Sequence, residues 1–479
     1  MIEKALIVSG GIVVLLTGLL ILQKKKVVFW ISFILTFLPL PYLTRYFDIE
    51  GPINFGWVNF FALAAIGVVI SVFKVRKMYI PKSMLILYFG VLLVSAMSMV
   101  LNRSNIFSLI FAQRNYIMLF AYFAVFRLVL DTYNKDEIMG FVANLGLASS
   151  FMAIFQRFVF VIALQIGSGD MVTGLFIDDG AFLYFQLISM CIVFVYWLKD
   201  HELPHLILQK PIAFFTMFMT LAVANNKAGL VLVILVMGLA LIKMGPAMII
   251  KHIGKIAVGI VAFMVILTIY EGYHNAAYGE SADDNTYAEN ITDPAFWFSY
   301  LVGDGTDESR FSKSGSLKRG AAVVFAYQQI QKSPAHYFFG RGPGSTAQTS
   351  FAGATNFLDK LYPNWKVGRT SMSFFIAETG MLGMLINVIF VISLFFWRPP
   401  GVRREPSRFT ITRQVFIILT IIYLFYENMY MLPVWALTIV VMIYPTYPKE
   451  VYQSSKQHKS VPEMEPHEKK ELTISEYQI

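Results

Sequence analysis

Charged side chains are scarce in this sequence. Asp, Glu, Lys and Arg make up 14% of its 479 residues, whereas a soluble domain carries about 25%. Hydrophobic residues reach 57%, and the mean hydropathy is +0.61. This small number of charges cannot keep the surface of a water-soluble protein of this size hydrated. The composition therefore excludes a soluble enzyme and predicts a protein embedded in lipid.

Cysteine and the common cofactor motifs are also nearly absent. Cys191 is the only cysteine, so no intrachain disulfide can form and the redox compartment stays open. His201 and His205 have i, i+4 spacing, but no carboxylate arrangement completes a metal site with them. Neither a P-loop, a dinucleotide fingerprint nor a serine-hydrolase elbow is present. The sequence therefore predicts no metal and no cofactor.

Long apolar runs dominate the sequence instead. A membrane-spanning helix needs about 20 largely apolar residues, because the hydrocarbon core is roughly 30 Å thick. Hydropathy predicts spans at 5–22, 27–44, 56–73, 83–101, 107–130, 138–165, 181–198, 206–224, 227–243, 255–271, 371–397, 410–427 and 431–447. Lys210 and Pro211 interrupt one run, so the count is about 13, within 12 to 14. Since backbone in lipid must satisfy its own hydrogen bonds, we expect an all-α polytopic fold.

Basic residues gather in alternate loops between these runs. The clusters are Lys24 to Lys26; Lys74, Arg76 and Lys77; Lys199 and Lys210; Lys243, Lys251 and Lys255; and Arg398, Arg403, Arg404 and Arg408. The positive-inside bias assigns these loops to the cytoplasm, which puts the N-terminus outside and the C-terminus inside. Because the charges cluster at span ends, we interpret the net charge of +9 as membrane anchoring and not as nucleic-acid binding.

The predicted organisation has four parts. Ten spans occupy 1–270, a large extracytoplasmic loop 271–370, three further spans 371–447, and a polar tail, expected to be disordered in the cytoplasm, 448–479. A loop of about 100 residues is usually functional or structured, and the spacing of Leu317, Ala321 and Val324 predicts a helix over 316–332.

Charge is sorted along that loop. From Glu271 to Glu308 the ionisable residues are acidic, and from Arg310 to Arg369 they are basic, with Asp359 as the exception. The basic half can attract a phosphate or another anion. Alternatively, the two halves pair with each other, and charge alone does not decide between these readings.

Ionisable residues inside apolar runs are a second signal. Arg114, Arg127, Arg157, Lys227 and Glu427 lie at or near membrane depth, where a charge is costly unless it faces a protein interior or a cavity. Arg127, Arg157 and Lys227 are close enough to span ends to reach the interface by snorkelling. Arg114 and Glu427 lie deeper, and an interior ion pair is the alternative to a functional role.

Glycine marks a loop at 339–345, Phe-Gly-Arg-Gly-Pro-Gly-Ser. Its bare backbone can approach an anion closely, with Arg341 adding charge. A tight turn is the alternative.

Three patches carry a family resemblance. The segment 369–383 resembles the pattern HNxxLxxLAExGxxG, with Glu378, Gly380 and Gly383 matching. Upstream, Arg319 is followed by a predicted helix and then by Gly340, Gly342 and Gly344. This order is similar to a pattern of an arginine, a helix and the motif PLxGxGxG. The third patch, at 174–180 and 225–229, looks like a GxFxxPN turn followed by the start of a helix. Together they resemble the O-antigen polymerase and O-antigen ligase superfamily over about residues 170–385, including Wzy-type polymerases.

The resemblance implies a GT-C-like membrane glycosyltransferase that uses no nucleotide. Its donor would be a glycan on polyprenyl pyrophosphate and its acceptor another lipid-linked repeat unit, at the outer face of the bacterial cytoplasmic membrane. It also implies a chain-length regulator and a flippase as partners. Where ligases of the family carry a histidine, this chain has Arg369, which favours a polymerase. A ligase remains an alternative. A transporter is another, although such carriers usually consist of two related halves and no repeat is visible.

Site residues follow from the same resemblance. Guanidinium groups grip phosphate oxygens in pairs, so we expect pyrophosphate to be bound by Arg319, Arg369, Arg341, Lys227 and Arg114. The candidates for a base that takes the acceptor hydroxyl proton are His336, Asp178, Asp179 and Glu378. Because pyrophosphate is a good leaving group, strong base catalysis is not essential.

Overall fold

The computed structural model describes part of the chain. The described residues are 82–106, 108–110, 112–113, 119, 135–165, 172–176, 179–224, 227–278, 311, 317–346, 357–362, 365–396 and 406–427. The predicted spans at 5–22, 27–44, 56–73 and 431–447 lie outside these residues, as do Arg114, Arg127, Asp178 and the predicted tail.

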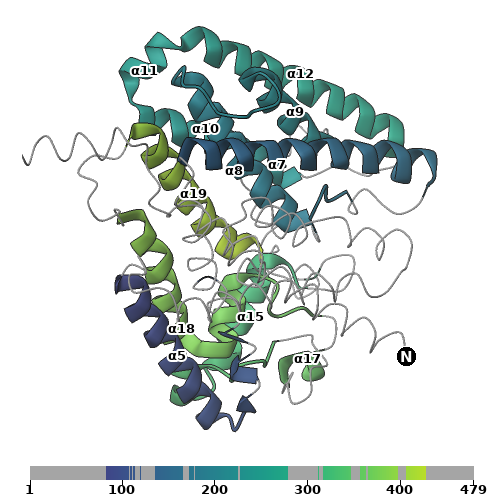
Figure 1. Cartoon of the computed structure of the whole chain (residues 1–479). Coiled ribbons are helices and arrows are strands. Elements are labelled where there is room, and N and C mark those ends of the chain that lie inside the picture. The colour runs from purple at the N-terminus through teal and green to yellow at the C-terminus, as the bar shows by residue number, and fades with distance from the viewer. Residues whose placement is uncertain are drawn as a thin grey trace, which may run out of the picture.

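The described residues are all-α, as predicted (Figure 1). In chain order the helices are α5 (Lys82–Leu101), α7 (Lys135–Phe155), the π-helix η1 (Gln156–Ala163), α8 (Asp179–Leu198), α9 (Lys210–Val223), α10 (Lys227–Met244), α11 (Pro246–Lys251), α12 (Ile253–Tyr278), α15 (Arg319–Ile330), α16 (Pro334–Phe339), α17 (Phe357–Leu361), α18 (Ser371–Phe396) and α19 (Ser407–Tyr426). Within this part of the chain, the only strand-like pairing is an isolated bridge between Phe311 and Leu317.

Within the described residues, four helical segments are long and apolar enough to cross a membrane. They are Lys135–Ala163, Asp179–Leu198, Ser371–Leu394 and Ser407–Tyr426. Several such helices in one chain indicate a multi-pass membrane protein, which agrees with the composition. The count of 13 spans stays a prediction.

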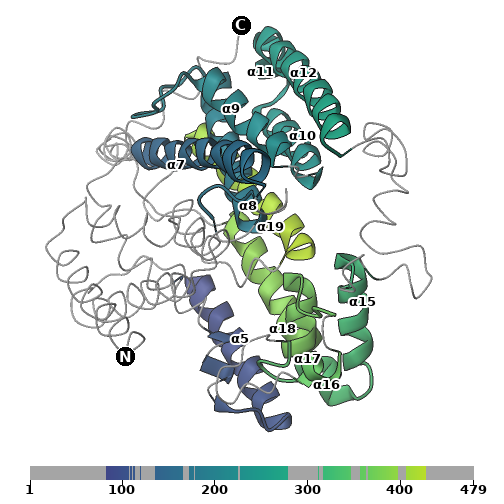
Figure 2. The ribbon, with the colours of Figure 1, turned by 90° about the vertical axis from the view of Figure 1, so that its right-hand side faces the viewer.

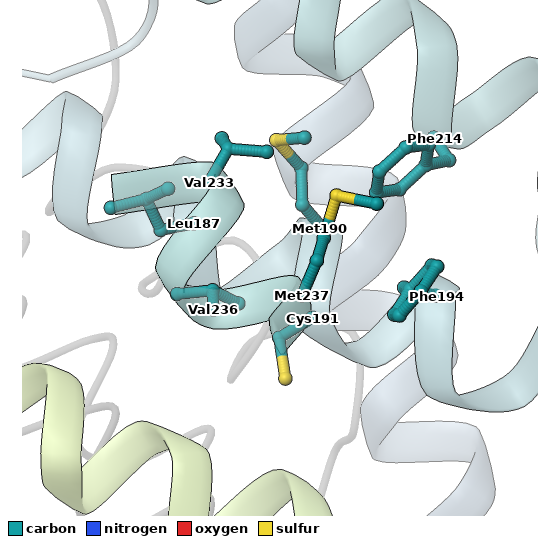
Figure 3. Close-up of a pocket in the computed structure, with 8 residues that line it drawn as sticks. All are labelled: Leu187, Met190, Cys191, Phe194, Phe214, Val233, Val236 and Met237. Carbon is teal, nitrogen blue, oxygen red and sulfur yellow. The ribbon is translucent and has the colours of Figure 1, made fainter. Parts of the chain in front are cut away.

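Helix α8 is the centre of one bundle. Every residue from Gly180 to Leu198 is buried, and α7, α9, α10 and α19 pack around it. A helix that is apolar on all sides is stable only with such complete cover. Between α8, α9 and α10, the flexible side chains of Met190 and Met237 and the ring of Phe214 meet around a narrow apolar gap beside Cys191 (Figure 3).

A second group of helices forms around α18. Figure 2 shows α5, α15 and α16 together with α18, below the bundle that contains α8. Helix α18 packs along α5, α15 and α16, and also contacts α19, which joins the two groups. The outward side chains of α5 and α18, such as Ile86, Leu93 and Ile389, are exposed and apolar. Surfaces of this kind suit contact with lipid tails.

Two helix boundaries differ informatively from the prediction. The run at 206–224 was predicted as one span interrupted by Lys210 and Pro211, but Lys210 is the first residue of α9 and Pro211 lies in its first turn. Proline is favoured there because the first N–H groups of a helix have no internal partner. The run at 138–165 continues from α7 into η1, so its last turns are π-helical.

Candidate functional site

The helices give the molecule two distinct ends. Near the start of α8, the Tyr184 ring lies 5.0 Å from that of Tyr423, near the end of α19. The start of α18 is also there, since Ser371 N–H donates to the carbonyl of Glu427 at 3.1 Å. We call this the Glu427 end. The starts of α7 and α19 meet the last turns of α8 at the opposite Asp136 end.

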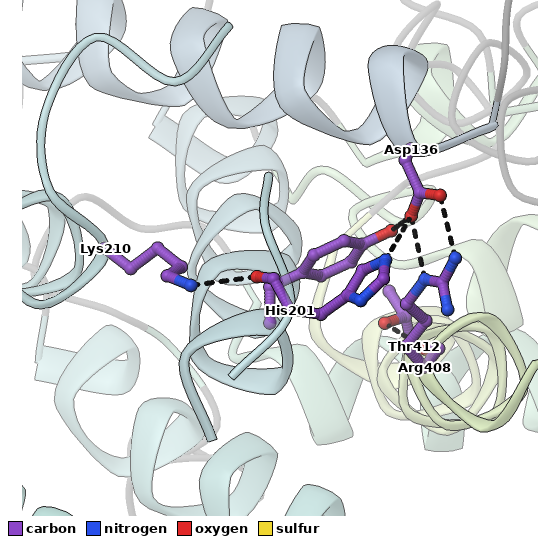
Figure 4. A network of polar contacts seen from close by, with 6 residues as sticks. Asp136, His201, Lys210, Arg408 and Thr412 are labelled. Atoms are coloured by element: carbon purple, nitrogen blue, oxygen red, sulfur yellow. Dashed lines mark hydrogen bonds and ion pairs between the residues drawn. The ribbon is translucent and has the colours of Figure 1, made fainter. Parts of the chain in front are cut away.

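A closed network of charges occupies the Asp136 end (Figure 4). Arg408 donates from Nε and Nη2 to the two carboxylate oxygens of Asp136, both at 2.8 Å, and Tyr196 donates its hydroxyl to Oδ1 at 2.6 Å. His201 Nε2 lies 3.9 Å from the same oxygen. A bidentate arginine–carboxylate pair is strong and geometrically specific. Asp136 thus ties α7, α8 and α19 together.

Other basic residues gather at the same end. Lys210 donates to the carbonyl of His201 at 2.8 Å. Lys255 pairs with Asp200, and its hydrogen bond is the main cause that holds the pKa of that carboxyl below its usual range. These lysines and Arg408 come from loops that the Lys/Arg bias assigned to a single membrane face. The structure brings these loops to one end of the bundle.

Arg319 lies at the Glu427 end, where α15 begins. Its Nε donates to the carbonyl of Tyr426 at 2.6 Å, its guanidinium lies 4.1 Å from the centre of the Tyr426 ring, and its Nη2 is 3.4 Å from Glu427 Oε2. The last carbonyls of α19 have no partner within their own helix, and a cation is favoured at that negative end. Arg319 therefore caps α19. Glu427, expected in an ion pair or a functional role, forms an ion pair with this arginine.

Arg369 is held next to Arg319. It precedes α18, and its Nη1 donates to the carbonyl of Leu317 at 3.0 Å, two positions before Arg319. The start of α18 is fixed by Ser371, whose N–H and hydroxyl both donate to the carbonyl of Glu427. The two arginines that the resemblance singled out are distant in sequence, and the structure brings them to the same short stretch of backbone.

Two glycines from separate patches of the resemblance meet face to face. Gly340 ends α16 at φ 74°, and Gly380 interrupts α18 at φ 68°. A Cβ on Gly340 would lie 2.6 Å from Gly380 N, and a Cβ on Gly380 would lie 2.6 Å from Gly340 N. The contact is reciprocal, so a side chain at either position would collide with the other's backbone.

The loop at 339–345, which we call the glycine loop, donates hydrogen bonds to the carbonyls at the break in α18. At the break in α18, the carbonyl of Ala377 accepts from Arg341 N–H at 2.7 Å, and that of Glu378 accepts from Gly342 N–H at 3.3 Å and from the Ser98 hydroxyl at 2.9 Å. Carbonyls left without a helical partner at membrane depth must find one in the protein. The N–H groups of Arg341 and Gly342 are therefore committed to α18. In this arrangement neither amide is open to an anion, and binding of an anion by the Arg341 side chain stays a prediction.

Glu378 holds the far end of the same loop. Its side chain is buried, 1% exposed, and its Oε1 accepts from the N–H and the hydroxyl of Thr346 at 3.3 and 2.8 Å. Glu378 was predicted to be one of the candidate bases. Its surroundings give it a positioning role for the segment from Gly340 to Thr346.

Arg341 and His336 lie near each other in the loop that was predicted to be extracytoplasmic. Arg341 donates from Nε and Nη2 to the carbonyl of Gln329 at 3.2 and 2.7 Å, and burial lowers its pKa. The Ser333 hydroxyl caps α16 by accepting from His336 N–H, and it also lies 3.0 Å from Nδ1. Burial, and then the charge of Arg341, lower the pKa of His336. Its imidazole is therefore neutral at pH 7 and able to accept a proton.

The remaining predicted residues begin other helices or lie outside the described residues. Asp179 is exposed and begins α8 at the Glu427 end. Lys227 begins α10, and Arg114 lies outside the described residues. The structure thus joins Arg319 to Arg369 and Arg341 to His336. It buries Glu378 beside Thr346.

Gln156 was missed by the sequence analysis. It is fully buried at the start of η1, its Oε1 accepts from the N–H groups of Thr173 and Gly174 at 2.9 and 2.8 Å, and its Nε2 donates to Gly174 O at 2.9 Å. One amide thus holds the turn of the third resemblance patch, where Gly174 has φ 59°. The signal was available, because a glutamine inside an apolar run is costly unless it is paired. π-helical turns also recur at functional sites.

Comparison of the sequence with known proteins gives no match. No protein-family model matches the sequence, and a search of curated proteins finds no match. The family resemblance therefore depends on the residues of the three patches and on how the structure arranges them.

Proposed function

We propose that this chain is a membrane glycosyltransferase. It polymerises oligosaccharide repeat units linked to polyprenyl pyrophosphate into a bacterial surface polysaccharide, at the outer face of the cytoplasmic membrane. The motif resemblance supports this reaction class, and the multi-pass apolar helices supply the setting that lipid-linked substrates require.

The hydrogen bond from Arg369 to the carbonyl of Leu317, two positions before Arg319, is the observation that carries the proposal. It occurs at the Glu427 end, opposite the end where Lys210, Lys255 and Arg408 gather. By the positive-inside bias the latter end faces the cytoplasm, so the two arginines face the outside. A lipid diphosphate has its phosphates at that boundary, where paired guanidinium groups bind them well.

The reaction needs charge stabilisation above all. A sugar hydroxyl of the acceptor attacks the anomeric carbon of the donor, the bond to the diphosphate oxygen breaks with its electron pair, and the hydroxyl proton is lost. Arg319 and Arg369 stabilise the charge that grows on the leaving diphosphate. Neutral His336 and exposed Asp179 are the groups able to take the proton, while Glu378 keeps the glycine loop in place.

A reconstituted assay tests this function. Purified protein in lipid nanodiscs is mixed with lipid-linked repeat units, and products are separated by length. We expect a ladder of longer chains, and a loss of about 100-fold in rate for Arg319→Ala and Arg369→Ala, as for other groups that stabilise transition-state charge. Lys360→Ala, which removes an exposed cation from the same loop, serves as the control and should leave the rate unchanged.

Three outcomes would overturn the proposal. Normal ladders from both arginine variants would remove the arginines from the reaction. Transfer of glycan to a different acceptor by the unmodified protein would indicate a ligase. Transport of the substrate without any covalent change would indicate a carrier.

A further inference from the structure

Four aromatic rings cluster on the outer loop, beside the arginines. Trp365 contacts Phe311, Phe325 and Tyr362, with ring centres 4.9, 5.1 and 4.7 Å away, and Phe325 contacts Tyr362 at 4.9 Å. All four side chains are only half-buried. We call these residues the ring cluster. It comes from α15, from the segment after α17 and from the bridge at Phe311.

The ring cluster lies at the margin of a small apolar core. The buried members of this core, among them Leu317, Ala322 and Leu358, are aliphatic, and the partly buried rings pack against them. Apolar side chains alone would be enough to cover such a core. Two of the rings also carry polar groups, the Tyr362 hydroxyl and the Trp365 indole N–H. Within the described residues neither group has a hydrogen-bond partner, although such groups usually find one when they are part of a core.

Cations flank the ring cluster on two sides. Leu317 N–H donates to the carbonyl of Trp365, and its own carbonyl accepts from Arg369, both at 3.0 Å. One residue thus connects the cluster to the proposed diphosphate site. On the other side, Tyr362 lies within electrostatic range of Arg341.

This combination of groups matches the chemistry of a sugar. A pyranose has a face of C–H groups that packs on the negative face of an aromatic ring, and an edge of hydroxyls that bind donors such as an indole N–H, a phenol or a guanidinium. Tyrosine and tryptophan also occur singly at membrane interfaces, as anchors. Four rings in mutual contact, joined by backbone hydrogen bonds to an arginine, favour a built ligand surface over anchoring.

We infer that the ring cluster binds a pyranose ring of the lipid-linked oligosaccharide, next to the diphosphate held by Arg319 and Arg369. This inference rests on the proposed function for the identity of the ligand. Trp365 supplies the stacking face, and Tyr362 and the indole N–H bind hydroxyls at the edge of the sugar.

Binding of two separate probes tests the inference. One probe is the oligosaccharide released by mild acid from lipid-linked repeat units, and the other is polyprenyl diphosphate without sugar. Both are titrated by calorimetry into protein in nanodiscs. Trp365→Leu should weaken binding of the oligosaccharide by about tenfold and leave the diphosphate probe within about twofold, whereas Trp365→Phe should retain most of the affinity.

Two further variants keep the test decisive. Tyr362→Phe removes only a hydroxyl and should weaken oligosaccharide binding even if Trp365→Leu fails to fold. Phe338→Leu, which changes an exposed ring of the same loop outside the ring cluster, is the control and should bind both probes normally.

The outcomes separate this inference from the proposed function. If Trp365→Leu and Tyr362→Phe bind the oligosaccharide as the unmodified protein does, and only membrane partitioning changes, the ring cluster is an interfacial anchor and the inference is wrong, whatever the ladder assay gives. If the oligosaccharide binds through the ring cluster but no ladder forms, the inference stands and the polymerase proposal fails.

Discussion

The two ends of the helical bundle treat charge differently. At the Asp136 end, Arg408 meets a carboxylate with two hydrogen bonds, and Lys255 pairs with Asp200, so opposite charges cancel. At the Glu427 end, Arg319 lies 3.4 Å from the carboxylate of Glu427 and also donates to the carbonyl of Tyr426, while Arg369 donates to the carbonyl of Leu317. Matched side-chain charges join helices. At the Glu427 end, main-chain carbonyls also hold the cations.

The largest expected effect is the loss of stability on removing the carboxylate at the Asp136 end. Asp136→Ala leaves Arg408 and Tyr196 without their carboxylate in a buried setting, and removing one partner of a buried pair costs about 3 to 5 kcal/mol. We expect the free energy of unfolding in detergent to fall by about that much. Asp200→Ala at the exposed Lys255 pair is the control and should cost under about 1 kcal/mol. Equal effects of the two variants would contradict the contrast between a buried network and a surface pair.

The glycine contact should give the next largest effect. In Gly380→Ala, the new Cβ would meet Phe338 backbone at 2.5 Å, at a φ that side chains disfavour. We expect a loss of about 2 kcal/mol in unfolding free energy and separation of the loop from α18. Hydrogen exchange at Arg341 and Gly342 measures this directly. Gly238→Ala, with open space around its Cβ, is the matched control and should be neutral or stabilising by up to about 1 kcal/mol.

Thr346→Val sharpens the comparison at the glycine loop. The variant keeps the size of the side chain but removes the hydroxyl that donates to Glu378 at 2.8 Å. A buried acceptor that loses a partner costs about 1 to 2 kcal/mol. Thermal unfolding should show this loss, and Thr346→Ser should restore most of it. A Thr346→Val protein as stable as the unmodified one would show that Glu378 does not depend on this bond.

Acid should affect His336 and Asp200 in different pH ranges, with the smallest effect on stability. The pKa of His336 is lower in the folded protein, so the unfolded chain binds a proton more readily. The contribution of neutral His336 to stability is therefore complete above the unfolded pKa of about 6.5. It is lost as the pH falls below that value. Asp200 has a lowered pKa too, so its contribution persists to lower pH and fades only below about 3.9. Unfolding temperatures at pH 7.5 and 5.5 should differ less in His336→Asn. An unchanged difference would contradict this account.

The sequence predicted the fold class better than the contacts of the site. Long apolar runs require helices in lipid, and α8, α18 and α19 lie close to their predicted spans. The helix predicted over 316–332 is α15, shorter at both ends. Lys210 and Pro211 were treated as an interruption, because an apolar window does not distinguish a helix start from a break.

The candidate site is formed by contacts between segments that lie far apart in the sequence. Arg319, Arg369, Gly340 and Gly380 were singled out from local motifs, but no local pattern states that the glycines touch each other or that Arg369 binds the carbonyl of Leu317, two positions before Arg319. Asp136 was not singled out, since an acid in the first turn of a helix is common and its partner Arg408 lies far along the chain. Long-range pairing of this kind has no signal in one sequence.

The reciprocal glycine contact also bears on how the protein is made. The carbonyls exposed by the break in α18 are satisfied by Arg341 and Gly342, which leave the ribosome before α18 does. A chain built from its N-terminus therefore has these donors waiting when the broken helix enters the bilayer. With the two segments in reverse order, α18 would enter lipid before Arg341 and Gly342 are made, and of these donors only the Ser98 hydroxyl would be present for the carbonyl of Glu378. The order of synthesis thus protects the weakest point of this helix during insertion.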